Sequence, residues 1–307
     1  MDAAVADVEE SFDRVVLVFN PVNRRVPRTI AEGLQEELRV RRPALPVTLV
    51  PTTHAGHARE LAAAEAEVGR PLVVAVSGDG VFSEVVNGVM EVADRRPGTS
   101  RQAVAAVVAG GNANDHRRST RRMSTVDAVA NGRTRRLDLL RLTVTTDVGV
   151  TTRYAHSYVG LGLTPLMAIG LNRASRGTWK ELLAVVRTVG TLAPVEVVTA
   201  DDEVLCLDSL VLANVERMAK YGRVSRSGQP DDGLFEVLAW PHRRRWRLGL
   251  TAVRAATVGL GHQTRTRRYA FRTTSDLPAQ VDGELVALPA GAQVTVECAH
   301  HALLTIG

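Results

Sequence analysis

Two glycine-rich segments of the sequence contain residues that could bind a phosphate group. The first is Ser77-Gly78-Asp79-Gly80, and the second is Ala109–Asp115, which reads AGGNAND. Glycines let the backbone approach a bulky anion, and the N-terminus of a following helix offers free N–H groups and a positive potential. Asp79 could face a ligand or a phosphate-bound metal ion. Taken alone, the first segment is better explained as a plain turn, and Asn114 and Asp115 are equally well explained as helix caps.

The elements around these segments predict a parallel α/β sheet. Three short apolar runs rich in β-branched residues, Val15–Phe19, Val73–Val76 and Val104–Val108, predict buried strands. Between the first two runs, Arg28–Arg39 and His57–Val68 have helix-forming residues with apolar positions three or four residues apart. Strands that alternate with helices are typical of a parallel sheet, where ligands bind at the carboxyl ends of the strands. Because both glycine-rich segments follow a predicted strand, we expect them to form one crevice.

The second half of the sequence has a different pattern. Beyond about Leu140, short segments rich in threonine and valine predict an antiparallel, β-rich domain. These segments are Leu139–Val144, Leu205–Ala213, Leu234–Ala239, Tyr269–Thr273, Gln280–Ala287 and Gln293–Val296. Helices are predicted around Trp179–Leu192 and Arg243–Val258. The polar, turn-prone stretch Asn131–Asp138 marks the expected boundary between two domains.

The composition excludes several classes of protein. With 307 residues, 45% of them hydrophobic and 23% charged, the chain is typical of globular proteins, and its length favours two domains. Cys206 and Cys298 are too few for a disulfide-built secreted fold or a cysteine-rich zinc site. The acidic start of the chain lacks the features of a signal peptide, and no apolar run is long enough for a membrane span. We therefore expect a cytoplasmic protein with, at most, peripheral membrane contact.

The positive charges are unevenly distributed along the chain. The formal net charge is +5, and all but two of the 38 basic residues are arginines. From Pro241 to Ser275 there is no acidic residue, while nine arginines accumulate. Such a stretch suits docking on an anionic membrane surface, and a solvated helix face explains it equally well. We expect no nucleic-acid partner, because aromatic residues make up only 4% of the chain and no recognition motif is present.

Six segments occur in an order that points to a known family. They are FNPVNRR (Phe19–Arg25), TTHAGHARELA (Thr52–Ala62), SGDGVFSEVVNG (Ser77–Gly88), AGGNAND (Ala109–Asp115), DDGLFEV (Asp231–Val237) and QVDGE (Gln280–Glu284). In this order they resemble the diacylglycerol kinase catalytic-domain family, which includes bacterial lipid kinases and the sphingosine and ceramide kinases. The segments span nearly the whole chain, and SGDG with EVVNG and QVDGE are the most specific parts.

The resemblance implies an ATP- and Mg²⁺-dependent kinase. Such an enzyme would transfer the γ-phosphoryl group to a hydroxyl of a lipid alcohol, diacylglycerol-like or sphingosine-like, or of another alcohol. The implied fold has a Rossmann-like α/β domain with a parallel sheet, residues 1–140, and a β-sandwich-like substrate and metal domain, residues 141–307. The implied active site lies in the cleft between them. Peripheral contact with an anionic membrane and a homodimer are both left open.

The resemblance also implies roles for individual residues. Glu284 is the first candidate for the general base that accepts the proton of the substrate hydroxyl, and Asp79 is the second. The implied nucleotide-binding positions are Asn20, Arg25, Thr52, Gly78, Asp79, Gly80, Glu84, Gly111, Asn112 and Asn114. The implied metal-binding positions are the Asp232 carboxylate and backbone carbonyls near Gln229 and Leu234. Without the resemblance, Asp282-Gly283 predicts a hairpin turn, and a turn is compatible with a site.

The sequence departs from the family pattern at several positions. Asn23-Arg24 replaces a small Ser-Gly pair, and Val108–Asn112 replaces a Pro-x-Gly-Thr sequence, with the loss of a threonine that faces the phosphates. Arg226–Gly228 replaces a Pro-x-Ala sequence near the metal motif, and His156 stands where asparagine is common. These departures bear on the substrate and the rate more than on the fold. They leave two other functions open: a kinase of a soluble or secondary-metabolite alcohol, and a non-catalytic nucleotide-binding protein.

Overall fold

The computed structural model describes residues 12–21, 25–98, 102–109, 124–162, 194–215, 217–218, 222–223, 229–242 and 263–306. The chain divides into two compact units, Met1–Leu137 with His301–Gly307, and Asp138–His300. The last residues of the chain therefore return to the N-terminal unit, which the sequence pattern does not indicate. The helices predicted around Trp179–Leu192 and Arg243–Val258 lie outside the described residues.

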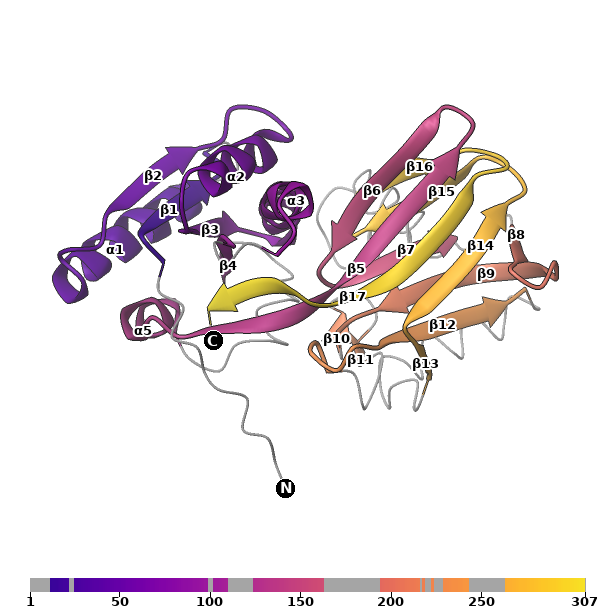
Figure 1. Cartoon of the computed structure of the whole chain (residues 1–307). Coiled ribbons are helices and arrows are strands. Elements are labelled where there is room, and N and C mark those ends of the chain that lie inside the picture. The colour runs from indigo at the N-terminus through magenta and orange to yellow at the C-terminus, as the bar shows by residue number, and fades with distance from the viewer. Residues whose placement is uncertain are drawn as a thin grey trace, which may run out of the picture. The chain divides into compact units, whose positions relative to one another are not determined.

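The first unit contains a four-stranded sheet in the order β2-β1-β3-β4 (Figure 1). Its strands are β1 (Arg14–Phe19), β2 (Val47–Pro51), β3 (Pro71–Ser77) and β4 (Val104–Ala109). Every pairing in this sheet is parallel, with β1 between β2 and β3, and β3 between β1 and β4. The predicted parallel sheet is therefore confirmed, and β2 is a strand that the apolar runs did not indicate.

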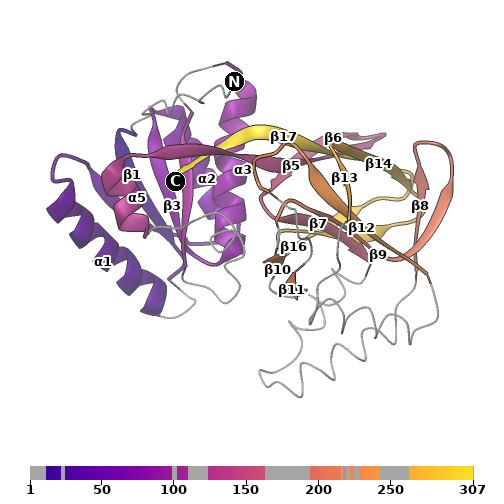
Figure 2. The same cartoon turned by 90° about the horizontal axis from the view of Figure 1, so that it is seen from below.

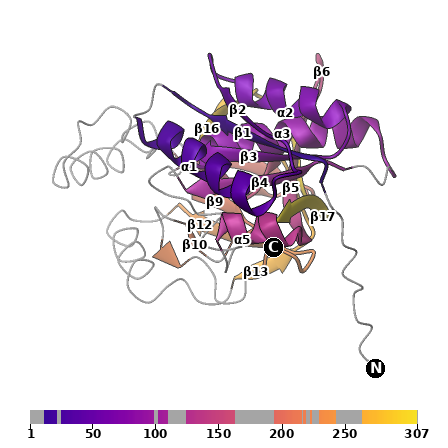
Figure 3. The same ribbon diagram turned by 90° about the vertical axis from the view of Figure 1, so that its left-hand side faces the viewer.

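Helices cover both faces of this sheet (Figure 3). They are α1 (Arg25–Arg41), α2 (His57–Glu67), α3 (Asp79–Arg95) and α5 (Thr125–Asn131). Leu34 and Leu38 of α1 and Val129 of α5 belong to one buried cluster with alternate residues of the strands, such as Leu17 and Val74. The helices α2 and α3 lie side by side on the opposite face (Figures 1 and 3). Residues Pro71–Val76 of β3 are all buried, as expected for a parallel strand covered on both faces.

The second unit is built around an antiparallel sheet of eleven strands (Figure 2). The main path is β16-β15-β7-β9-β8-β14-β17-β5-β6, and β12 joins it through β9 and also pairs with β13. The strands are β5 (Thr134–Thr146), β6 (Gly149–Ala155), β7 (Tyr158–Gly162), β8 (Val195–Thr199), β9 (Val204–Ala213), β12 (Phe235–Pro241), β13 (Thr264–Thr266), β14 (Arg268–Thr273), β15 (Leu277–Val281), β16 (Glu284–Leu288) and β17 (Gln293–Ile306). A separate two-stranded ladder joins β10 (Arg217–Met218) and β11 (Gly222–Arg223).

The large sheet curls around one apolar core. Leu140, Leu161, Leu212, Phe235 and Val294 come from five different strands and belong to a single buried cluster. The predicted combination of a parallel α/β half and a β-rich antiparallel half is confirmed. The structure also divides the segment predicted at 280–287 into the end of β15, a tight turn and most of β16. Among the described residues, no helix is long and apolar enough to cross a membrane.

Candidate functional site

The carboxyl ends of the parallel strands bring three predicted nucleotide-binding residues to one edge of the first unit. Asn20 follows β1, Thr52 follows β2, and Gly78 follows β3. Phe19, at the end of β1, is paired with Pro51 at the end of β2 and with Val76 near the end of β3. The buried Thr52 donates its backbone N–H to the Phe19 carbonyl at 2.8 Å, which fixes the loop against β1.

The N-terminus of α3 lies at this same edge. The helix begins at Asp79, and Gly78 before it has an extended backbone, with φ −87° and ψ −176°. Gly80 is exposed, and a Cβ added there would meet no atom within 4 Å. The absence of a side chain at Gly80 therefore leaves the first turn of α3 open to a ligand. Backbone N–H groups in the first turn of a helix have no partner within the helix, so this end favours an anion.

Glu84, on the second turn of α3, organises the neighbouring loop and helix. Its Oε1 accepts a hydrogen bond from the Gly56 backbone N–H at 3.1 Å, and its Oε2 accepts one from the Ala58 N–H at 3.0 Å. A carboxylate at a helix N-terminus satisfies free N–H groups and interacts favourably with the helix dipole. In the structure Glu84 thus caps α2 from α3, and its predicted contact with the nucleotide stays a prediction.

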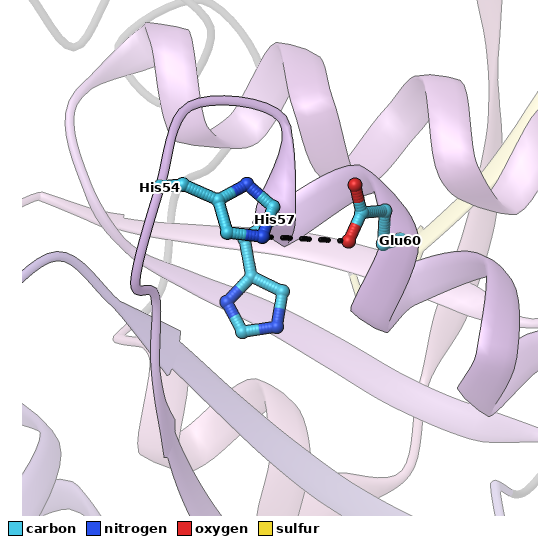
Figure 4. A group of neighbouring side chains, drawn as sticks. All are labelled: His54, His57 and Glu60. Carbon is cyan, nitrogen blue, oxygen red and sulfur yellow. Dashed lines mark ion pairs between the residues drawn. The ribbon is translucent and has the colours of Figure 1, made fainter.

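Two histidines and a glutamate cluster close to Thr52, where the loop after β2 enters α2 (Figure 4): His54 lies in the loop, and His57 and Glu60 lie in the first turn of the helix. The rings of His54 and His57 are stacked with centroids 4.7 Å apart, and His54 Nε2 lies 3.6 Å from Glu60 Oε2. His57 Nδ1 accepts the Thr53 backbone N–H at 3.0 Å. Two imidazoles that lie face to face do not direct their in-plane nitrogen lone pairs at one point, as a metal ion requires. The cluster therefore orders the loop. It was not predicted from the sequence, where Thr52 was the only residue of this segment given a role.

In the second unit, the candidate base Glu284 follows a two-residue hairpin turn. Val281 of β15 is paired with Glu284 of β16, so Asp282-Gly283 forms the turn that the sequence predicts. Both turn residues have positive φ, 48° and 98°, as in a type I′ turn. The half-buried Glu284 carboxylate is 3.3 Å from Arg153 Nη1 on β6.

The buried carboxyl group of Asp282 ties this hairpin turn to the turn between β6 and β7. It accepts hydrogen bonds from the backbone N–H groups of His156 (2.7 Å), Ser157 (2.8 Å) and Tyr158 (3.0 Å). His156 Nε2 lies 3.4 Å from Asp282 Oδ2, and its Nδ1 lies 2.7 Å from Ser157 Oγ. Burial raises the pKa of Asp282, and His156 and the backbone donors oppose that shift. These contacts fix the backbone that carries Glu284.

A second buried carboxylate, that of Asp138, holds the turn that contains Asp232. Asp138 Oδ2 accepts the Gly233 backbone N–H at 2.7 Å, and the Asp138 N–H donates to the Pro230 carbonyl at 2.7 Å. Asp138 Oδ1 lies 2.8 Å from His300 Nδ1. Desolvation and the nearby Asp138 charge raise the pKa of the Cys298 thiol to about 12. Sequence reasoning missed Asp138, although a charged residue inside the apolar run Leu137–Leu140 is a recognisable signal.

The predicted metal ligand Asp232 is engaged by protein groups. Its Oδ1 accepts the backbone N–H of Leu234 at 3.0 Å, and its Oδ2 forms an ion pair with Arg265 Nη2. The other two predicted metal positions flank it, Gln229 exposed and Leu234 half-buried. A Mg²⁺ ion needs oxygen atoms with free lone pairs arranged around it. The described residues therefore do not fit a Mg²⁺ ion at Asp232.

A comparison with protein families identifies the first unit. Residues 14–142 match the family model described as the diacylglycerol kinase catalytic domain. These residues belong to the diacylglycerol kinase catalytic-domain family. The resemblance drawn from the sequence motifs is thereby confirmed. Asn20, Thr52 and Gly78 lie within the matched diacylglycerol kinase range, whereas Asp232 and Glu284 lie beyond it.

Solved structures share the fold of the whole chain, beyond the diacylglycerol kinase catalytic domain. A diacylglycerol kinase from Bacillus anthracis strain Sterne is similar with a TM-score of 0.67 and 16% identity, over 96% of this chain and 97% of that chain. The yeast NADH kinase, solved with NADH, is similar with a TM-score of 0.54 and 10% identity, over 97% of this chain and 84% of that chain. A search of curated proteins finds no match. At these identities the likeness to the solved structures concerns the fold.

Several residues predicted to act in the diacylglycerol kinase family lie outside the described residues. They are the second glycine-rich loop with Gly111, Asn112 and Asn114, and the side chain of Arg25, whose backbone begins α1.

Within the acid-free stretch Pro241–Ser275, Arg265 pairs with Asp232, and Arg268 Nε lies 3.5 Å from Glu297 Oε1. These two arginines are thus already engaged with carboxylates of the second unit.

Proposed function

We propose that the protein is an ATP-dependent kinase that phosphorylates a hydroxyl of a lipid alcohol, either diacylglycerol-like or sphingosine-like. The observation that carries the proposal is the meeting of Asn20, Thr52 and the Gly78–Gly80 start of α3 at one edge of a domain of this family. Phosphoryl transfer depends mainly on positioning and on neutralising charge, and this edge offers groups for both.

The nucleotide phosphates are proposed to lie at the N-terminus of α3. This 17-residue helix provides a positive end and free backbone N–H groups, and Gly80 leaves them accessible. Asn20 and Thr52 follow β1 and β2, the next two strands on one side of β3. In this proposal Mg²⁺ is bound to the nucleotide phosphates, and Asp232 is not one of its ligands.

The general base is proposed to be Glu284, with Asp79 as the other candidate. Glu284 is half-buried at the start of β16, next to the turn that the buried Asp282 holds, and its carboxylate lies 3.3 Å from Arg153 Nη1. A base must lie within hydrogen-bond distance of the hydroxyl that it deprotonates. Asp79 lies at the N-terminus of α3, beside the proposed phosphate position, where a ligand-binding or metal-bridging role also suits it.

Transfer assays with labelled ATP, Mg²⁺ and a panel of alcohols test the function. The panel should contain diacylglycerol, a sphingoid base, ceramide and soluble alcohols, with the lipids presented in vesicles or mixed micelles. We expect transfer to one of the lipids. Transfer to a soluble alcohol alone would overturn the lipid assignment, and transfer to none would favour a nucleotide-binding protein without catalysis.

A soluble acceptor is the second candidate function. The observation that favours it is the shared fold with the yeast NADH kinase, a relative solved with a soluble dinucleotide. NADH and NAD therefore belong in the panel. Phosphorylation of either one, with no lipid phosphorylated, would support this second function.

The variant Glu284→Gln tests the base. We expect kcat to fall by about 10²–10⁴-fold, because general-base catalysis contributes on that order, while ATP binding is retained. Glu297→Gln is the matched control, since Glu297 lies in the same unit and pairs with Arg268 on the adjacent strand. If Glu284→Gln keeps full activity and Asp79→Asn loses it with ATP binding intact, the base is Asp79.

A further inference from the structure

Arg265 forms an ion pair with Asp232, the residue predicted to bind a structural cation. Asp232 lies in the turn that enters β12, and Arg265 lies on β13. In the antiparallel pairing of these strands, Arg265 is directly opposite Glu236. The sheet register therefore places Arg265 beside Glu236, and its guanidinium also reaches Asp232 in the preceding turn.

The guanidinium contacts both carboxylates. One nitrogen, Nη2, is paired with Asp232 Oδ2, and Arg265 Nε lies 3.7 Å from Glu236 Oε1. The side chains are 28% exposed for Arg265, 21% for Asp232 and 2% for Glu236. A buried carboxylate such as that of Glu236 is costly without a nearby positive charge. A planar guanidinium with five N–H donors can serve two carboxylates at once.

The remaining oxygen of Asp232 is also used. Oδ1 accepts the backbone N–H of Leu234, which closes the turn onto its own side chain. A Mg²⁺ ion on Asp232 would have to displace Arg265 or lie beside its positive charge. Like charges at such short distances repel, so the metal and the guanidinium compete for one place.

We propose that Arg265 replaces a structural metal ion in this protein. The turn containing Asp232 is held by Arg265, Asp138 and the Leu234 N–H, so its folding does not require a divalent cation. The proposal concerns the second unit alone and does not depend on which alcohol the enzyme phosphorylates. It also removes Arg265 from the basic residues available for an anionic partner.

Binding of Mn²⁺, a paramagnetic substitute for Mg²⁺, tests the proposal on the whole protein without nucleotide. We expect the wild type and Asp232→Asn to bind the same amount of Mn²⁺, because Asp232 binds none in the wild type. In Arg265→Ala we expect one Mn²⁺ per chain, lost again in the double variant Arg265→Ala/Asp232→Asn. Arg268→Ala is the control, because it removes a neighbouring arginine that pairs with Glu297, and it should bind no Mn²⁺.

Thermal unfolding gives a second measurement. At matched ionic strength, the wild type should unfold at the same temperature in Mg²⁺ and in a chelator. Arg265→Ala should unfold several degrees lower in chelator and regain part of that loss in Mg²⁺.

Two results would overturn the proposal. One is a wild-type protein that binds Mn²⁺ through Asp232, a measurement that does not depend on any arginine variant folding. The other is an Arg265→Ala protein that is as stable as the wild type and binds no metal.

Discussion

At the scale of single residues, the carboxyl group of Asp282 connects the two turns nearest to the candidate base. Three backbone N–H groups from residues 156–158 donate to it, and the carboxyl group is buried. The sequence predicts the hairpin turn at Asp282-Gly283, because Asp-Gly tolerates the positive φ of a type I′ turn. It does not indicate that the same aspartate also receives three hydrogen bonds from another turn.

Replacing Asp282 by asparagine should destabilise the protein by about 1–3 kcal/mol. The amide has one acceptor oxygen, and its NH₂ group would face backbone N–H donors that then lose their partner. Urea unfolding measures the change. Asp147→Asn is the matched control, because Asp147 is exposed in the turn after β5, and it should leave stability nearly unchanged. Equal stability of the two variants would contradict the importance of the Asp282 bonds.

At the scale of elements, Gly88 determines how closely α2 and α3 pack. A Cβ added at Gly88 would lie 2.3 Å from the Arg59 carbonyl oxygen and 2.9 Å from the Ala62 Cβ. Both atoms belong to α2 and cannot move without shifting that helix. The glycine in the EVVNG motif is therefore required by the contact between the helices. This contact in turn keeps Glu84 close to the N-terminus of α2.

Gly88→Ala should destabilise the first unit by about 1–3 kcal/mol, as overpacking of a tight contact does. The better helix propensity of alanine offsets only about 1 kcal/mol of this cost. Gly33→Ala in α1 is the control, because a Cβ there meets nothing within 4 Å, and it should be neutral or stabilising. Chemical denaturation of both variants makes the comparison, and a stabilised Gly88→Ala would show that α2 can move away.

At the scale of the whole molecule, the acid-free stretch Pro241–Ser275 is either a contact with anionic membranes or a solvated surface, and a charge reversal distinguishes the two. Reversing the charge of Arg243, Arg244 and Arg245 to glutamate should weaken binding to phosphatidylserine vesicles, because each basic residue near such a surface contributes about 1 kcal/mol. The control reverses three arginines elsewhere, Arg28, Arg39 and Arg95, which are all more than half exposed. Vesicle co-sedimentation measures the binding of both variants. An equal loss of binding in the two variants would mean that only the net charge of the protein matters.

Much of the fold follows from local sequence patterns. The apolar runs at Val15–Phe19 and Val73–Val76 became β1 and β3, since a parallel strand covered on both faces is continuously apolar. The strand β2 was not predicted, because its residues are only partly buried and its apolar run is short. The return of His301–Gly307 to the first unit was also missed, because nothing local marks which sheet a strand will join.

The sequence by itself determined the two kinds of sheet, the family of the first unit, and the residues that follow β1 and β3. Those features depend on periodicity and on short motifs, which are local. Only the tertiary structure decided the partners of the charged residues. Glu84 meets Gly56 across 28 residues, Asp138 meets Gly233 across 95, and Asp232 meets Arg265 across 33. Such contacts depend on strand order, register and helix packing, so the chemistry expected at Asp232 could be judged only once Arg265 was placed beside it.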